Sequence, residues 1–372
     1  MLGFAYGVLE GTKVGWDDPA FLHGSKGTPP DYPVTMGFRI PRIDHRKGLR
    51  DGYMKAGKQT TLGTRATVSG VGVHSGLPVT LTLHPAEAGT GIVFVRLDAD
   101  GRPEREIRAH ASCVTATELA TVLGDDSSGP CVSTIEHVMA TLCGLGVDNA
   151  IIEIDGAEAP IMDGSAAAFV EAIDQAGIVA LAMPRRYTKV LKTIRVEKGD
   201  AFGELTPYDR GFHVDVTIDF PHPLIGRQSV AFDVEAGAFR REVSRARTFG
   251  FMKDVSKLWS AGYALGASLE NTLVVADDRL LNPEGLRYAD EFVRHKALDA
   301  IGDLALAGAP ILGAYKSFKG GHKLNHAMLC ALIADPTAWT VVEAKSVVRA
   351  PRARGHADAA GLVAPVYQAD QS

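Results

Sequence analysis

Apolar and polar residues alternate along two stretches of the chain, and each stretch leads into segments with helical spacing. From about Thr67, ATVSGVGVHSGLPVTLTLHPA alternates with a period of two, which predicts strands separated by glycine-rich turns. GTGIVFVRLD and DNAIIEIDG are apolar enough to be further strands. STIEHVMATLCGLG and GSAAAFVEAIDQAGI have apolar residues at helical spacing. We therefore expect two helices, the first capped by Ser133 or Thr134 and the second ending near Gly177.

The same order of elements starts again after residue 183. YTKVLKTIRVEKGD, GELTPYD and FHVDVTIDFPHP are predicted strands, and residues 245–276 form a mixed segment. DEFVRHKALDAIGDLALAG predicts a strong amphipathic helix, and HKLNHAMLCALIAD predicts a last helix. Strands followed by helices, twice over, indicate an α+β protein of two halves with helices packed on β-sheets. We place domain I at residues 58–183 and domain II at residues 184–349.

The two ends of the chain lack this patterning. Residues 1–57 are rich in glycine, proline and charge, which predicts a disordered extension. Because Met54 stands just before the patterned region, translation from an upstream start codon is a second interpretation. A chain that starts at Met54 should keep full activity, and a large loss of activity would refute that interpretation. Residues 350–372 are predicted to be a flexible tail.

Length and composition fit a soluble globular protein with two cores. The chain has 372 residues, of which 46% are hydrophobic and 22% are charged. Its net charge of −5 gives no indication of nucleic-acid binding. We find no signal peptide and no apolar stretch of about 18 residues that would span a membrane. The cysteines form no CxxC pair, which suits a reducing compartment, so we expect a cytoplasmic protein.

One predicted helix carries two residues that can bind a metal ion together. In RHKALDAIGD, His295 and Asp299 stand four residues apart, so their side chains share one face of the helix. An imidazole and a carboxylate at this spacing can bind one zinc ion. Asp303 lies one turn further along the same face, where it could support a ligand. Taken alone, the element is better explained by an ordinary capped or salt-bridged helix face, since Asp and Lys are common on exposed helices.

Two other segments add acid–base groups. Glu136 and His137 are adjacent in STIEHVMATL, and a zinc-ligating histidine beside a glutamate is the combination that zinc proteases use to activate water. The spacing differs from HExxH, so an exposed glutamate beside a half-buried histidine is the alternative. His322 follows two glycines in FKGGHKLNHAM and could stabilise an oxyanion or protonate a leaving amine, although a lone loop histidine is usually solvated. His326 is interpreted as a helix-face residue.

These elements fit together as one catalytic centre. A catalytic zinc ion needs three protein ligands and an open position for water, and His137, His295 and Asp299 provide the three ligands. Glu136 would be the base and His322 the acid. The combination favours metal-assisted amide hydrolysis.

The motifs resemble one family of enzymes. STIEHVMATLCGLGVDNAIIEIDGAEAPIMDGSAAAFV, SRARTFGF, EFVRHKALDAIGDL, KGGHKLNHAM and SGVGVHSG occur in the order found in UDP-3-O-acyl-N-acetylglucosamine deacetylases, over roughly residues 58–345. The resemblance implies zinc-dependent removal of acetate from a UDP-linked acylated amino sugar, the committed step of lipid A biosynthesis in Gram-negative bacteria. It also implies a monomer of two related α+β domains, with the active site at the domain interface. Each domain is expected to carry an insert, and the second, at about residues 245–276, to form a tunnel for the acyl chain.

The resemblance further implies roles for single residues. Three are implied zinc ligands: His137, His295 and Asp299. Four take part in the chemistry: Glu136 as general base, His322 as electrostatic or general-acid partner, Asp303 as the group that orients His322, and Thr248 as a hydroxyl that helps to hold the oxyanion. Six are implied to contact substrate: Phe249, Lys296 and His74, with Val255, Ala264 and Ser268 lining the acyl channel. For the three channel residues, ordinary core packing is the alternative.

Rival readings remain open at this point. The same metal triad could serve a zinc amidohydrolase that acts on a different acylated sugar. A non-catalytic protein with structural zinc is disfavoured, because such sites are closed by four Cys or His ligands and these cysteines do not cluster near His137 or His295. Iron(II) can occupy a site of two histidines and an aspartate as readily as zinc. The sequence sets neither the acyl chain length nor whether one residue or two residues transfer the protons.

Overall fold

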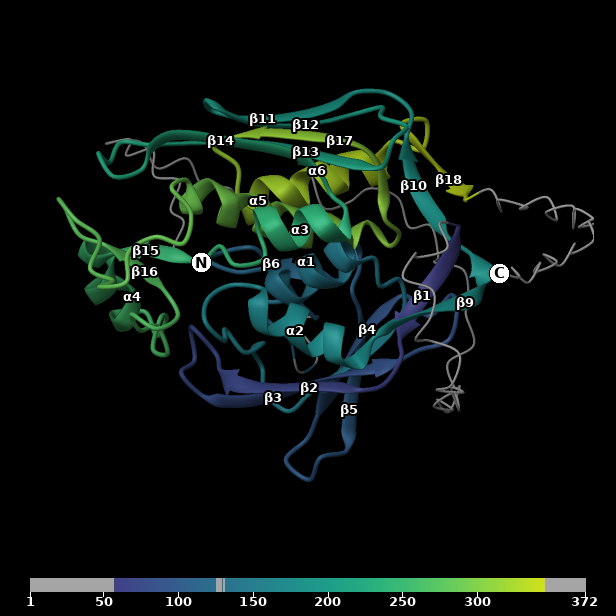
Figure 1. Cartoon of the computed structure of the whole chain (residues 1–372), viewed down its shortest axis with the longest axis horizontal. Coiled ribbons are helices and arrows are strands. Elements are labelled where there is room, and N and C mark those ends of the chain that lie inside the picture. The colour runs from purple at the N-terminus through teal and green to yellow at the C-terminus, as the bar shows by residue number, and fades with distance from the viewer. Residues whose placement is uncertain (1–56, 125–128, 130, 345–372) are drawn as a thin grey trace, which may run out of the picture.

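The computed structural model describes residues 57–124, 129 and 131–344, and there two β-sheets enclose a double layer of helices (Figure 1). The lower sheet in the figure has five strands in the order β2-β3-β8-β4-β5. Its strands are β2 (Ala66–Val71), β3 (Pro78–Pro85), β4 (Ile92–Leu97), β5 (Pro103–Arg108) and β8 (Ala150–Ile154). In β3 every second residue is buried, which is the alternation predicted from the sequence.

The upper sheet has seven strands and is organised around β17. Its strands are β10 (Arg186–Val190), β11 (Ile194–Lys198), β12 (Ala201–Thr206), β13 (Phe212–Phe220), β14 (Gly226–Asp233), β17 (Ile311–Phe318) and β18 (Trp339–Glu343). β17 pairs with β12 in antiparallel orientation, and with β13 and β10 in parallel orientation. The strands predicted from the sequence did not include β5, β14, β17 or β18, so the central strand of this sheet, β17, was not predicted.

The helices between the sheets form two layers that meet in the middle of the molecule. They are α1 (Glu136–Leu145), α2 (Ala167–Ala176), α3 (Ala236–Glu242), α5 (Glu291–Leu304) and α6 (His322–Ala334). α2 packs on β2 of the lower sheet, α5 and α6 pack on the upper sheet, and α1 packs on α5. The α+β class of two related domains predicted from the sequence is confirmed.

α1 and α5 approach each other closely because of a glycine. A Cβ atom added at Gly302 of α5 would lie 2.0 Å from the carbonyl oxygen of Glu136, so a larger residue there would push the helices apart. This contact brings the first turn of α1 against the C-terminal half of α5.

Two local predictions were wrong and one was confirmed. α1 has Ile135 at its N-cap without a side-chain cap, because the hydroxyls of Ser133 and Thr134 donate instead to the Ala157 carbonyl and the Glu158 carboxylate. α5 is not amphipathic: every residue except Arg294 is buried, since the helix is covered by the upper sheet on one side and by α1 on the other. α2 ends before Gly177, as predicted.

The mixed segment forms a small unit at the left of Figure 1. It contains the parallel strands β15 (Phe249–Phe251) and β16 (Leu273–Val275), the 3₁₀-helix η3 (Met252–Asp254) and α4 (Val255–Ser260). Short elements elsewhere are η2 (Ala111–Cys113), β6 (Val114–Ala116), β7 (Val122–Leu123) and η4 (Ala305–Ala307).

A separate two-stranded antiparallel sheet pairs β1 (Lys58–Leu62) with β9 (Ile178–Pro184). The domain boundary placed at residues 183/184 falls on the last residues of β9. The predicted extension at residues 1–57 and the predicted tail at 350–372 lie outside the described residues, apart from Gly57. Among the helices that the structure describes, none has the length and apolar character needed to cross a membrane.

Candidate metal and catalytic site

The three predicted metal ligands come together where α1 packs on α5. His137 stands in the first turn of α1, while His295 and Asp299 share one face of α5. The Nε2 atoms of His137 and His295 lie 3.7 and 3.4 Å from Oδ1 of Asp299, and all three side chains are at most 2% exposed. The two imidazole rings are nearly perpendicular, with centroids 5.0 Å apart. The packing of α1 on α5 therefore brings together ligands that are far apart in the sequence.

The donor set fits a metal ion. Among the described residues, His137 Nε2, His295 Nε2 and Asp299 Oδ1 are buried atoms without a hydrogen-bond partner. An unpaired buried polar atom costs about 1–3 kcal/mol, so three that converge on one point indicate a bound cation. Nδ1 of His295 donates to the Ala246 carbonyl at 3.0 Å, which leaves Nε2 with a free lone pair. Burial lowers the pKa of His295 to about 3, which keeps the imidazole neutral, as a metal ligand must be.

The other oxygen of Asp299 is occupied. Lys296 Nζ donates to Asp299 Oδ2 at 2.9 Å, and the lysine is itself 6% exposed. This bond directs Oδ1 toward the two imidazoles. The site thus offers two nitrogens and one oxygen, the three-ligand pattern of a metal centre with an open position.

A second buried group lies beside the metal ligands and contains Glu136, Asp303 and His322. His322 is the first residue of α6, and its Nδ1 donates to Asp303 Oδ2 at 2.8 Å. Thr121 Oγ1 donates to the other Asp303 oxygen at 2.7 Å, and Asn325 Nδ2 donates to Asp303 Oδ2 at 2.8 Å. His322 Nε2 is buried without a hydrogen-bond partner among the described residues, 4.0 Å from Asp299 Oδ2. The free side of this imidazole therefore faces the metal ligands.

The electrostatics of this group favour proton transfer. Burial raises the pKa of Glu136 to about 8, although the nearby His322 charge acts against the shift. Burial by itself lowers the pKa of His322, but the charge and hydrogen bond of Asp303 outweigh it and raise that pKa to about 9. Glu136 Oε2 accepts a hydrogen bond from the Thr121 amide at 3.2 Å, while Oε1 has no partner among the described residues. A carboxylate that titrates near neutral pH thus stands beside an imidazole that is cationic there.

Phe249 packs against His295, and Thr248 precedes Phe249 in the chain. Thr248 is buried, and its hydroxyl has no hydrogen-bond partner in the described part of the chain. The Phe249 ring is 1% exposed and packs edge-on against Phe292 at 5.0 Å and His295 at 6.4 Å. Lys296 Nζ lies 5.9 Å from the centre of the same ring. The structure therefore places the predicted ring beside His295, with the predicted cation near the same ring.

His74 and the three predicted channel residues stand further out. Both ring nitrogens of His74 are buried and lack partners among the described residues, and burial lowers its pKa to about 4. Its ring packs edge-on against Tyr263 of the insert, 5.5 Å away. Val255, Ala264 and Ser268 are all in the insert, where Ala264 packs with Leu258 in a small separate core. His326 is half-buried on α6, with Nε2 3.1 Å from the Ala111 carbonyl, which fits a helix-face residue.

Several groups that support this site were not predicted from the sequence. Thr121 and Asn325 bind Asp303, and the Ala246 carbonyl orients His295. Thr121 belongs to no recognisable motif, and no sequence pattern shows which backbone carbonyl will accept a hydrogen bond from a histidine. Only Asn325, three residues after His322 on a predicted helix, could have been suspected from spacing.

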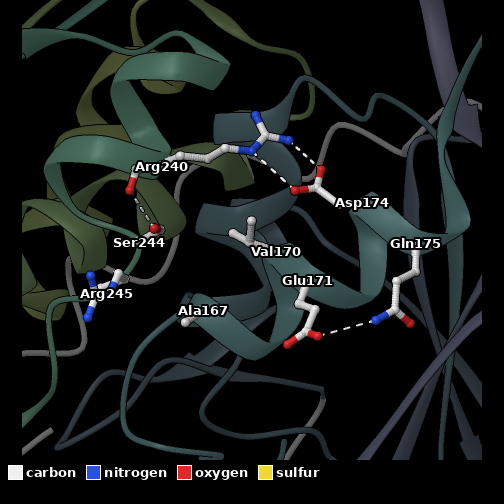
Figure 2. A pocket seen from close by; sticks show the side chains of 8 residues that line it. All are labelled: Ala167, Val170, Glu171, Asp174, Gln175, Arg240, Ser244 and Arg245. Carbon is white, nitrogen blue, oxygen red and sulfur yellow. Dashed lines mark hydrogen bonds and ion pairs between the residues drawn. The ribbon is translucent and has the colours of Figure 1, made fainter.

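A surface hollow of about 590 Å³ lies elsewhere, between α2 and α3 (Figure 2). Asp174 and Arg240 form an ion pair across it, and Ser244 donates to the Arg240 carbonyl. None of its lining residues belongs to the two buried groups described above.

Comparison with known proteins connects this geometry to a family. Residues 59–334 match the model of the LpxC family, UDP-3-O-acyl N-acetylglycosamine deacetylase. The chain belongs to this deacetylase family. Relatives from Brucella ovis, Brucella canis and Brucella melitensis, each named UDP-3-O-acyl-N-acetylglucosamine deacetylase, are 52% identical over 288 residues. These matches cover 77% of this chain and 99% of each relative.

Membership of the deacetylase family confirms the resemblance predicted from the motifs, and with it the enzyme class. The family match covers all the residues of the two buried groups, from Glu136 to His322. Together with the converging ligand atoms, it identifies a metalloenzyme with a candidate metal site where α1 packs on α5.

Proposed function

We propose that this chain hydrolyses the acetamide of UDP-3-O-acyl-N-acetylglucosamine, giving acetate and UDP-3-O-acyl-glucosamine, the committed step of lipid A biosynthesis. The observation that carries the proposal is the convergence of three unpaired, buried ligand atoms beside Glu136 and His322. A metal group alone would suit many proteins. The adjacent carboxylate and cationic imidazole supply the acid and base that amide hydrolysis needs.

The ligand set proposed for Zn²⁺ is His137, His295 and Asp299. Two imidazoles and one carboxylate with an open position suit zinc, and Fe²⁺ is the alternative ion for the same donors. Bound zinc supplies a Lewis acid for the acetamide carbonyl and for the attacking water.

Glu136 is the proposed general base. Its free Oε1 atom can accept the proton of the attacking water, and burial, which raises the pKa of Glu136 to about 8, makes this carboxylate a stronger base than an exposed one. His322, held cationic by Asp303, stabilises the negative charge that develops on the carbonyl oxygen, and the unpaired Thr248 hydroxyl donates to the same oxygen. His322 or Glu136 then protonates the departing amine.

The substrate contacts follow from the placement of the outer residues. Phe249 and Lys296 lie beside the metal group, and Lys296 offers a cation to the diphosphate. His74 presents two unpaired ring nitrogens from domain I. Val255, Ala264 and Ser268 are proposed to line the acyl channel within the insert at residues 245–276.

In the proposed enzyme, two domains of one chain each supply part of the active site. Domain I, residues 58–183, supplies Glu136 and His137, and domain II, residues 184–349, supplies the other ligands and His322. One chain thus provides the whole site, which supports a monomer. The four free cysteines fit the reducing environment of the cytoplasm.

The test is acetate release from UDP-3-O-acyl-N-acetylglucosamine by the purified protein, before and after chelation and after addition of zinc. Release that stops with chelation and returns with zinc supports reaction, substrate and metal together. A folded, zinc-loaded protein that releases no acetate would refute the substrate, and acetylated sugars with other acyl groups would then be assayed.

A further inference from the structure

Glu158 carries a buried carboxylate that lies outside the metal and acid–base groups. It lies after β8 and is 4% exposed. Its Oε1 atom accepts hydrogen bonds from the His74 amide at 2.8 Å and from the Thr134 hydroxyl at 3.1 Å, and its Oε2 atom accepts one from the Ser75 amide at 2.8 Å. Three donors from two separate segments thus converge on one carboxylate.

One of these segments leads directly into the active site. Thr134 stands two residues before Glu136, and its φ of +57° is a left-handed conformation that is unfavourable for a β-branched residue. Ser133 is held by backbone hydrogen bonds to both sides of Glu158: its amide donates to the Ala157 carbonyl at 2.9 Å, and its carbonyl accepts from the Ala159 amide at 2.9 Å. The segment around Glu158 is therefore fixed to the start of α1.

The other segment is the turn between β2 and β3, residues 72–76, which carries His74. Its far side contacts the domain II insert, because the Leu265 amide donates to the His74 carbonyl at 3.0 Å and the Gly266 amide donates to the Val73 carbonyl at 3.1 Å. The contact is tight: a Cβ atom at Gly266 would lie 2.2 Å from the Gly72 carbonyl oxygen. The turn is thus held between Glu158 on one side and the insert on the other.

We propose that Glu158 is a positioning residue for substrate binding: its carboxylate fixes the 72–76 turn, and through it the places of His74 and the insert relative to α1. A carboxylate is required because all three partners are donors. In Glu158→Gln the side-chain NH₂ would face the Ser75 amide in one orientation, and the His74 amide together with the Thr134 hydroxyl in the other. In both orientations two N–H donors oppose each other, and the turn loses part of its anchor.

The positioning can be measured without substrate, by hydrogen exchange of the zinc-loaded protein. In E158Q we expect faster exchange of the amides of His74 and Ser75 and of Leu265 and Gly266, with unchanged zinc content. Ser133→Ala is the matched control, because its hydroxyl binds the same segment through the Ala157 carbonyl but does not contact the turn. Exchange of the turn and insert that is equal in E158Q and the parent would overturn the proposal.

The consequence for catalysis rests on the proposed deacetylation and is measured separately, as acetate release. We expect KM in E158Q to rise about tenfold, the scale of losing a charge-assisted anchor, with a smaller change in kcat. The double variant with His74→Ala should raise KM by less than the product of the two single effects, because both act through the same imidazole. If KM of the double variant rises by the full product of the two single effects, Glu158 does not act through His74.

If E158Q fails to fold, Glu158→Asp serves as the second variant, because it keeps the charge but shortens the side chain. If E158Q gives no cooperative unfolding transition, E158D must show the same faster exchange in the turn and insert, with a smaller increase in KM. An E158D protein identical to the parent in both measurements would overturn the proposal. Faster exchange without any acetate release in the parent would instead count against the proposed reaction and leave the positioning role supported.

Discussion

Replacing Asp303 with asparagine tests whether the charge on His322 drives the reaction. The substitution keeps the size of the side chain and leaves one oxygen to accept from His322 Nδ1, at the place of the present 2.8 Å bond. It removes the negative charge that, together with this bond, overcomes the effect of burial and raises the pKa of His322 to about 9. Without that charge, burial dominates, and the pKa should fall to 6.5 or below.

The size of the effect follows from these two values. At pH ~7.5 an imidazole with a pKa of about 9 is roughly 97% protonated, whereas one with a pKa of about 6.5 is roughly 9% protonated. kcat/KM should therefore fall about tenfold or more at that pH. Because the active form is the cation, activity is present below the pKa and is lost as the pH rises through it. The basic limb of the pH profile should thus move to lower pH by about 2.5 units in D303N.

The assay is acetate release between about pH 5.5 and 9.5 by the zinc-loaded parent and D303N, with zinc content measured in parallel. Thr121→Val is the matched control, since it removes a neutral hydrogen bond to Asp303 and leaves the charge in place. The control should keep the basic limb of the parent. A D303N protein that retains zinc and whose basic limb does not move would refute the reasoning.

Three other substitutions test the ligand set, the base and the support of the site. Glu136→Ala should lower turnover by about 10²–10⁴-fold, the scale of general acid–base catalysis, with zinc retained; loss of zinc would mean that Glu136 is a ligand. Asp299→Ala removes one of the unpaired ligand atoms, so zinc content measured after dialysis should fall and zinc should no longer raise Tm; full occupancy would contradict the ligand set. Arg247→Met leaves the buried Glu291 carboxylate without the guanidinium that donates to it at 2.9 Å, and should lower the free energy of unfolding in urea by about 3–5 kcal/mol. A loss below about 1 kcal/mol, as for an exposed ion pair, would show that the Glu291 charge is not isolated.

The local parts of the fold could be predicted from the sequence because they depend on short-range spacing. Period-two alternation marked β3, helical spacing and a terminal glycine marked α2, and the interval of four residues put His295 and Asp299 on one face. The family motifs extended this to residues that spacing alone left ambiguous, such as the adjacent Glu136 and His137.

Spacing failed where a neighbour from elsewhere in the chain decides the outcome. α5 has the polar residues of an exposed helix, yet it is buried on both sides, and its charges are satisfied by one another and by Thr121, Asn325 and the Ala246 carbonyl. Likewise, Ser133 and Thr134 have the chemistry of helix caps, but the segment around Glu158 offers their hydroxyls other acceptors.

The sequence by itself therefore determined which residues could do chemistry and which pairs share a helix face. The tertiary structure decided which of them meet. The close contact at Gly302 brings His137 to Asp299, and the start of α6 brings His322 to Asp303. Burial then sets the pKa values of Glu136 and His322, because removing a charge from water costs free energy that only specific neighbours can offset. Distances across the chain and exposure to water are properties of the packed molecule, and no local pattern encodes them.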